Sequence, residues 1–456
     1  MENLDIDADV LQKLAMIERV APDVARDIRD GLDASIVEYA RRMYQLDRSP
    51  PCALVASYRG KLAAKLVSRA AELGIAVSQH HVLDSLSEFP IIQTAPHCQL
   101  YLDPMAFWAY FVGWIGAFES DCRLIPVFNT ATVTLQSAAS SGPAWLSTAT
   151  GALNITTSPS SRLSGTSVCA AGTAVAFDLT KLAALHARAT PAEQRVIATL
   201  EHSIEASPRG FADATDRANV NLIRSLSRAR ICPVMFTESL ICDLMADLLA
   251  ERDPRIWGML FEPARNARLH AAFERASTQL YGHFWSPATT HFWGIRDRKI
   301  RRLELRDGWL VEADRGGGLR VRFECDALID ELRSERLVPN LFWSFVLVTL
   351  LPRLSAIGGT RQIGYLNGFA DVLRRTLDLE DPGERELGDA LRTLRLCTWG
   401  AKVIEHMPAP LAVLSTLPPG EELEALYDQF RSITLRQATR SLQIFDGHRR
   451  WRHVSA

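Results

Sequence analysis

The polar residues that could do chemistry gather where a short apolar run ends in a loop. Gln93 and Thr94 close the apolar run 89–92, and His97 and Gln99 follow in the loop. An imidazole and amides at the end of a strand can bind phosphate or carbonyl oxygens, so we predict that His97 and Gln99 are catalytic. Gln93 and Thr94 would orient the substrate. The same side chains could instead satisfy the backbone of an ordinary turn, and the sequence leaves that alternative open.

A second group of suitable residues is the turn Gly358-Gly359-Thr360, which follows the apolar run 354–357. Glycines let the backbone approach a ligand or let a helix pack closely on its strand. Thr360 suits the N-cap of a helix predicted over 361–377, whose first N–H groups would point at the loop. We predict that this turn is a second anion or carbonyl site.

The first group belongs to a predicted strand-loop-helix-strand unit that spans 89–135. Asp103 and Pro104 are residue types preferred at the N-cap and first position of a helix. The apolar stretch 105–118 predicts a helix buried on most sides, and 124–128 predicts the second strand. A right-handed βαβ crossover places the loop at the carboxyl end of the first strand, beside the positive end of the helix dipole.

The whole chain divides by pattern into four segments of an α/β protein. Periodicity and glycine-proline breaks assign 1–178 to N-terminal helices and the first half of the core. Segment 179–300 reads as a mainly helical insertion. Segment 301–380 contains a β-hairpin, signalled by Asp307-Gly308, and the second half of the core.

The last segment, 381–456, is predicted to be helical throughout. Its amphipathic stretches, 384–402 and 421–445, have the pattern of long helices that pair as a hairpin. Such a coiled-coil-like pair can form a dimer interface, so we expect a homodimer.

The composition is that of a globular chain without a strong charge. Of its 456 residues, 47% are hydrophobic and 23% are charged, which is enough core for about two or three domains. The net charge of −2 and the pI near 6.6 give no electrostatic signature for binding nucleic acid or an anionic membrane. An acidic N-terminus and the lack of an apolar stretch of bilayer length predict a cytoplasmic protein.

The residue types that bind metals are dispersed. The eight cysteines form no CxxC pair and have no regular spacing, so we expect reduced thiols and no structural zinc. His80 and His81 are adjacent, and adjacent side chains on regular structure point apart. No metal site is predicted.

Two stretches resemble motifs of the bacillithiol-biosynthesis cysteine-adding enzymes. Val338-Pro339-Asn340 and the segment 358–365 are similar to that family's Pro-Asn element and its Gly-Gly-Pro-x-Glu-Ile-x-Tyr turn. Asp103-Pro104 and the strand Ile125-Pro126-Val127-Phe128 resemble the start of its aromatic-rich helix and its Val-Pro-Val-Phe strand. The resemblance covers most of the chain. It implies a Rossmann-like parallel-sheet core, as in class I aminoacyl-tRNA synthetases, and a C-terminal coiled coil.

The resemblance also implies a set of site residues. Gly358, Gly359 and Thr360 would bind the cofactor, and the substrate would be bound by Gln93, Thr94, Asn129, Asn340, Gln362 and Tyr365.

Several departures from the family pattern alter the implied pocket. His97 meets the family's histidine only if the loop slips by one residue. The family's acidic Glu-Asp-His-Asp cluster is replaced by Asn129-Thr130-Ala131-Thr132. Gln362 replaces a glutamate and Ser344 replaces an arginine. The loss of these charges indicates a different acceptor.

These observations predict a ligase-like enzyme that joins an amino acid to a small acceptor in a thiol or secondary-metabolite pathway. The resemblance suggests cysteine as the amino acid and ATP or another activated donor as the energy source. Two alternatives stay open. One is a binding or scaffold protein that has lost catalysis on the same fold. The other is a carrier-dependent acyl or aminoacyl transferase with Cys98 as nucleophile, although Cys98 could equally be a buried structural cysteine.

Overall fold

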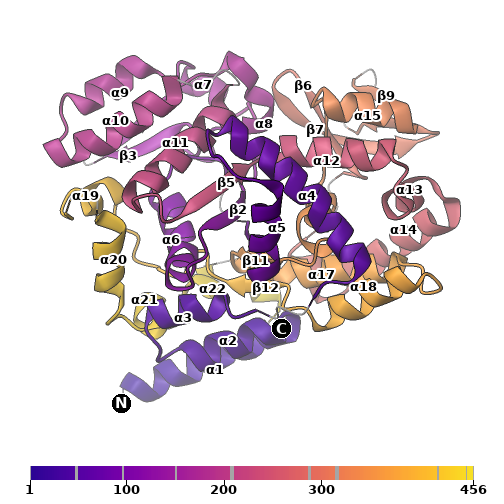
Figure 1. Ribbon diagram of the computed structural model, residues 1–456, viewed down its shortest axis with the longest axis horizontal. Helices are drawn as coiled ribbons and strands as arrows, with labels where there is room; N and C mark the ends of the chain where they lie inside the picture. Colours follow the sequence, from indigo (N-terminus) through magenta and orange to yellow (C-terminus); the bar gives the residue numbers. More distant parts are fainter. Residues whose placement is uncertain are drawn as a thin grey trace.

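The computed structural model describes residues 2–46, 50–94, 97–148, 151–205, 210–285, 289–313, 318–418, 421–447 and 449–454. Helices dominate these residues, and Figure 1 shows them around the strands. The α-helices are α1 Glu2–Val20, α2 Pro22–Gly31, α3 Ile36–Met43, α4 Ala53–Glu72, α5 Gln79–Glu88, α6 Pro104–Glu119, α7 Ser160–Leu163, α8 Val168–Ala171, α9 Leu179–His186, α10 Pro191–Glu205, α11 Phe211–Leu226, α12 Glu238–Ala250, α13 Pro254–Phe261, α14 Pro263–Thr278, α15 Cys325–Arg333, α16 Leu341–Phe345, α17 Thr360–Thr376, α18 Pro382–Thr393, α19 Pro410–Leu414, α20 Glu422–Phe430, α21 Leu435–Ala438 and α22 Ile444–Gly447. The shorter helical turns are η1 Gly172–Ala174, η2 Leu280–His283, η3 Val346–Leu350, η4 Arg440–Leu442 and η5 Trp451–His453.

A five-stranded parallel sheet forms the centre of the fold. Its strands are β1 Ile91–Gln93, β2 Leu124–Phe128, β5 Cys232–Phe236, β11 Ser355–Gly358 and β12 Cys397–Trp399. Their order is β12-β11-β1-β2-β5, and each neighbouring pair is parallel. The chain therefore adds β2 and β5 on one side of β1, and later adds β11 and β12 on its other side. The α/β class expected from the sequence is confirmed.

Two strands of this sheet lie in segments that the sequence predicted to be helical. β5 lies within the predicted insertion 179–300, and β12 lies inside the predicted long helix 384–402. β12 is three residues long, so it is too short to show the alternation by which a strand is recognised. β5 is a continuous buried apolar run, which periodicity cannot distinguish from a buried helix.

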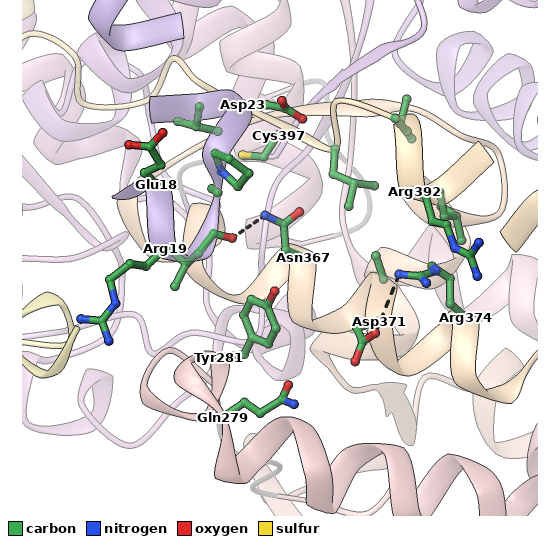
Figure 2. A pocket seen from close by; sticks show the side chains of 18 of the residues that line it. Glu18, Arg19, Asp23, Gln279, Tyr281, Asn367, Asp371, Arg374, Arg392 and Cys397 are labelled. Atoms are coloured by element: carbon green, nitrogen blue, oxygen red, sulfur yellow. Dashed lines mark hydrogen bonds and ion pairs between the residues drawn. The ribbon is translucent and has the colours of Figure 1, made fainter. Parts of the chain in front are cut away.

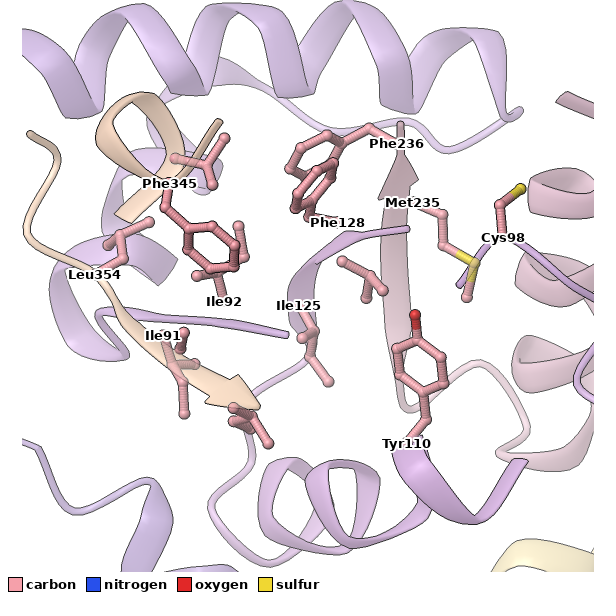
Figure 3. Close-up of a cluster of buried hydrophobic side chains, with 14 of the residues drawn as sticks. Ile91, Ile92, Cys98, Tyr110, Ile125, Phe128, Met235, Phe236, Phe345 and Leu354 are labelled. Atoms are coloured by element: carbon pink, nitrogen blue, oxygen red, sulfur yellow. The ribbon is translucent and has the colours of Figure 1, made fainter. Parts of the chain in front are cut away.

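Apolar side chains cover both faces of the central sheet. Figure 3 shows Ile92, Phe128 and Phe236 on one side of the strands, with Phe345 of α16. On the opposite side lie Ile91, Ile125 and Tyr110 of α6. All of these side chains are almost completely buried. Because both faces are covered, the strands read as continuous apolar runs, as is usual in parallel sheets.

A second, antiparallel sheet has the order β10-β6-β7-β8-β9. Its strands are β6 Phe292–Arg296, β7 Lys299–Arg306, β8 Trp309–Glu312, β9 Arg320–Arg322 and β10 Leu337–Pro339. The predicted hairpin is confirmed, since Asp307 and Gly308 both have positive φ (48° and 76°) in the turn between β7 and β8. Strands β3 Trp145–Thr148 and β4 Gly151–Asn154 form a separate pair.

After β12, the described C-terminal residues form short helices and not the predicted coiled coil. The predicted helix 421–445 is divided into α20, α21, η4 and the start of α22. α20 packs on α6 of the same chain, where Phe430 meets Phe111 with ring centroids 5.0 Å apart. Figure 1 shows α20 beside α6. The apolar face expected to form a dimer is therefore buried within one chain.

In the described part of the chain, no helix combines the length and the apolar character needed to cross a bilayer.

Candidate functional site

The strand order reverses between β1 and β11, and the loops after these two strands lie side by side. Gln93 at the end of β1 is paired with Ile357 of β11, and the N–H of Thr94 donates to the Ile357 carbonyl over 3.1 Å. In open parallel sheets, ligands bind at such a reversal, outside the carboxyl ends of the strands. We refer to the region after β1 and β11 as the switch-point site.

Thr94 and Gln362 meet across this point, as the sequence suggested. The Thr94 hydroxyl donates to the Gln362 side-chain oxygen over 2.7 Å, and the Gln362 nitrogen lies 3.7 Å from the Cys397 sulfur of β12. A Cβ on Gly358 would lie 2.3 Å from the Gln362 amide carbon. Glycine is therefore needed at 358 to admit the Gln362 side chain of α17. This matches close packing of the helix on its strand, one of the two roles that the sequence allowed for the glycines.

Gln99 supports the start of α6. Its amide nitrogen donates to the Asp103 carboxylate over 2.8 Å, and the same carboxylate oxygen accepts the N–H of Ala106 over 3.1 Å. Asp103 is thus the N-cap that the sequence predicted. Burial raises the pKa of Asp103, although the backbone N–H groups and Lys402 act in the opposite direction. Gln99 is a positioning residue in this arrangement.

Three basic side chains gather at the switch-point site. His97 and Arg361 are exposed, and Lys402 is half-buried. The pKa of His97 is lowered to about 4, mainly because the surrounding protein removes water from the ring and also because Lys402 and Arg361 are positively charged. Burial likewise lowers the pKa of Lys402, with Arg361 adding to the effect and Asp103 opposing it. The three side chains lie close enough for the charge of Arg361 to act on both His97 and Lys402, and for that of Lys402 to act on His97.

Two of these basic groups have no salt-bridge partner in the part of the chain that the structure describes. Among the described residues, no carboxylate lies within ion-pair distance of Arg361 or Lys402. Lys402 also has a left-handed backbone (φ 58°), an uncommon conformation for a residue with a long side chain. No side chain caps α17 in the described structure, so its first turn adds a partial positive charge. The arrangement is suited to bind an anion.

Thr360 does not have its predicted role. Gly359 takes the N-cap position of α17, and Thr360 is the first helical residue. The Thr360 side chain is buried, and its carbonyl accepts the indole N–H of Trp451 over 3.2 Å. The glycine turn therefore contributes the uncapped start of α17, and Thr360 connects it to the C-terminal region.

Asn129 and Asn340 are held in structural networks. Asn129 accepts from the Tyr110 hydroxyl and donates to buried Asp216 over 2.8 Å. Asn340 caps α16, accepting the Trp343 N–H over 3.2 Å, and it follows β10 of the second sheet. The chain neighbour of Asn129, Thr130, pairs with His97, but the Asn129 side chain itself is engaged with Tyr110 and Asp216. Contacts of Asn129 and Asn340 with a substrate stay predictions.

Gln93 and Tyr365 are also directed into the interior. The Gln93 amide donates to the Ala109 carbonyl of α6 over 3.5 Å, and its oxygen has no partner among the described residues. Tyr365 packs between Phe345 and Phe369, with ring centroids 5.5 and 5.1 Å away. Burial raises the pKa of the Tyr365 hydroxyl. Both side chains shape the core behind the switch-point site.

Cys98 is not suited to act as a nucleophile. Its side chain has no exposed surface, and its sulfur lies 3.9 Å from the Ala212 carbonyl. Burial raises the pKa of the thiol well above its usual value, with the charges of Asp216 and Glu238 adding to the effect. A reactive cysteine needs an accessible thiolate. The structure supports the alternative of a buried structural cysteine.

The sequence analysis missed the functional potential of Arg361 and Lys402. Arg361 directly follows the predicted glycine turn, so its position at the start of α17 could have been noticed. The sequence predicted that Lys402 lies at the end of a long helix. It is β12, just before Lys402, that brings this residue to the switch-point site. Within the described ranges, no group of three or more His, Cys, Asp or Glu side chains is arranged to hold a metal ion.

Comparison with known proteins gives no match: neither a protein-family model nor a curated protein corresponds to this chain.

Proposed function

We propose that the switch-point site binds an anionic substrate and that the protein is a ligase-like enzyme on a Rossmann-type core. It would join an amino acid, with cysteine as the first candidate, to a small acceptor in a thiol or secondary-metabolite pathway. The observation that carries the proposal is the group His97, Arg361 and Lys402 beside the uncapped start of α17. A phosphate or carboxylate would relieve the repulsion between the positive charges of Arg361 and Lys402.

The side chains at the site favour catalysis by positioning. Arg361 and Lys402 would bind a phosphate of ATP or another activated donor, and charge developing on it would be stabilised by donors already in place. Each such donor contributes on the order of 3 kcal/mol. His97, with a pKa lowered to about 4, is neutral near pH 7 and a weak base. It would serve as a hydrogen-bond donor rather than as a proton acceptor.

A second candidate, a binding protein without catalysis, is favoured by one observation. Among the described residues, the carboxylate that acts on Lys402 is Asp103, and Asp103 is engaged as the cap of α6. The site therefore lacks an evident general base. A protein that binds an anion and releases it unchanged needs none.

The two candidates are separated by measuring binding and product formation together. The melting temperature should rise with ATP, because a ligand bound only by the folded state stabilises it. Mass spectrometry of mixtures with ATP, cysteine and a panel of amine and carboxylate acceptors should then show a conjugate of cysteine and acceptor. Loss of this product in Arg361→Gln supports the ligase. A thermal shift without product supports the binding protein, and no shift with any nucleotide contradicts both.

A further inference from the structure

A separate pocket lies along the second half of α17, whereas the glycine turn is at the start of this helix. It has a volume of about 470 Å³, within the range of small-molecule sites, and it is bounded by the junction of α1 and α2, by α17, and by the segment between α18 and β12. Figure 2 shows its polar lining, including Tyr281, Asn367, Asp371, Arg374 and Arg392. None of these residues was singled out by the sequence or used in the switch-point site.

One end of the pocket is positively charged. The Arg374 Nη1 is 3.8 Å from the Asp371 carboxylate, which is beyond hydrogen-bond distance. Asp371 is already engaged by Arg375 over a shorter distance of 2.7 Å. Arg392 pairs with the exposed Asp389 over 3.3 Å, an interaction of a kind that contributes little. Arg374 and Arg392 therefore retain donors for a ligand.

A neighbouring pocket of about 260 Å³ extends the site. It shares Asp371, Arg374, Arg375 and Arg392 with the first pocket. The guanidinium groups thus lie between two hollows. A ligand whose charged group binds to these guanidinium groups could place the rest of the molecule in the larger hollow.

The larger hollow offers uncharged hydrogen-bonding groups beside apolar side chains, while Glu18, Arg19 and Asp23 line its other end. Asn367 donates to the Val20 carbonyl over 2.7 Å, which orients its amide and leaves its oxygen as an acceptor. Burial raises the pKa of Tyr281, so its hydroxyl is neutral and can donate. Apolar side chains that include Leu391 and Leu396 complete this part of the lining.

We propose that this pocket binds a small organic anion, with its carboxylate or phosphate on Arg374 and Arg392 and its uncharged body against Tyr281 and Asn367. The proposal does not depend on the function of the switch-point site. The two sites are separated by the contact between Gln362 and Cys397, the latter lining the pocket. A ligand here would therefore lie one residue layer from the switch-point site.

Phenyl phosphate is a suitable probe because it combines an anionic group with an uncharged ring. Titration calorimetry is performed on Arg361→Gln protein, in which binding at the switch-point site is weakened. We expect phenyl phosphate to bind more tightly than inorganic phosphate or phenol. Adding Arg374→Gln or Arg392→Gln should weaken its binding by about tenfold or more, the loss expected for one charged hydrogen bond.

Arg385→Gln is the matched control, because Arg385 is exposed on α18 and lines neither hollow. Its guanidinium donates to the carbonyl of Leu379, which borders the smaller hollow. The substitution should leave the affinity unchanged. The proposal is overturned if phenyl phosphate does not bind at millimolar concentration, or if Arg385→Gln weakens it as much as Arg392→Gln. Exposed Arg392 can be replaced without disturbing the core, so this comparison holds even if Arg374→Gln does not fold.

Discussion

Arg361 and Lys402 lie near each other and near His97, although like charges repel. The fold holds them there by other means: Arg361 is fixed at the start of α17, and Lys402 follows β12. Placing repelling groups at a surface costs stability, and such costs are common at functional sites. A bound anion would offset this cost.

The charge state of His97 gives a prediction for anion binding. Because its pKa is lowered to about 4, His97 stays uncharged as the pH falls from about 8 to about 6. The affinity for sulfate, which does not titrate in this range, should be flat over this interval when measured by calorimetry. An increase in affinity centred near the ordinary histidine pKa, and lost in His97→Gln, would contradict this account.

His291 gives a prediction for stability in acid. Its ring is fully buried, and burial lowers its pKa to about 3, so the unfolded chain takes up a proton at a higher pH than the folded protein. Stability should therefore fall as the pH drops from 6.5 towards 3. The loss is about 2 kcal/mol between pH 6.5 and 5, from 1.36 kcal/mol per pH unit.

Urea unfolding at these two pH values tests the effect of His291. His291→Gln keeps a side chain that can accept the indole N–H of Trp343, now 3.2 Å from the ring, and should lose most of this acid sensitivity. The exposed His80 is the control, and His80→Gln should retain the sensitivity. If the two variants lose stability equally in acid, the assignment to His291 is wrong.

At the scale of elements, the sequence predicted those helix starts and turns that are determined by residues close together in the chain. Asp103-Pro104 marked the start of α6, and Asp307-Gly308 marked the β7–β8 turn. β12 was missed because three residues acquire strand character only by pairing with β11. The same holds for the residues of the switch-point site. Thr94 and Gln362 were predicted from local turn signals, whereas Lys402 reaches the site only because β12 pairs with the sheet.

The position of α17 depends on close packing at Gly364. A Cβ there would lie 2.2 Å from the Phe284 ring, a distance that requires the buried ring or the helix to move. Gly364→Ala should therefore destabilise the protein by about 1–3 kcal/mol, the usual cost of overpacking, as measured by urea unfolding.

Gly60 in α4 is the matched control, because a Cβ there would have no atom within 4 Å. Gly60→Ala should stabilise the protein by about 0.5–1 kcal/mol through helix propensity alone. If both variants gain stability, α17 is not packed against Phe284 as described.

At the scale of the whole molecule, segments distant in sequence build one central sheet and cover it. Residues 91 to 399 contribute its strands, and α20 near the C-terminus covers α6. The sequence predicted the parallel core but assigned the C-terminal apolar faces to a dimer. Homodimerisation remains a prediction, and it would need a surface other than the face of α20 that packs on α6. Light scattering of the full chain measures it directly.

The central claim is that Arg361 and Lys402 bind the phosphate of a substrate. The most direct measurement is a calorimetric titration of ATP into the wild-type protein and into the double variant Arg361→Gln, Lys402→Gln. The exposed pair Arg385→Gln, Lys299→Gln removes the same charge away from the site and serves as the control. We expect the site variant to lose affinity by about 100-fold, from two charged hydrogen bonds, and the control to bind as the wild type does. Equal affinity in all three proteins, or no binding of ATP by the wild type, would contradict the account.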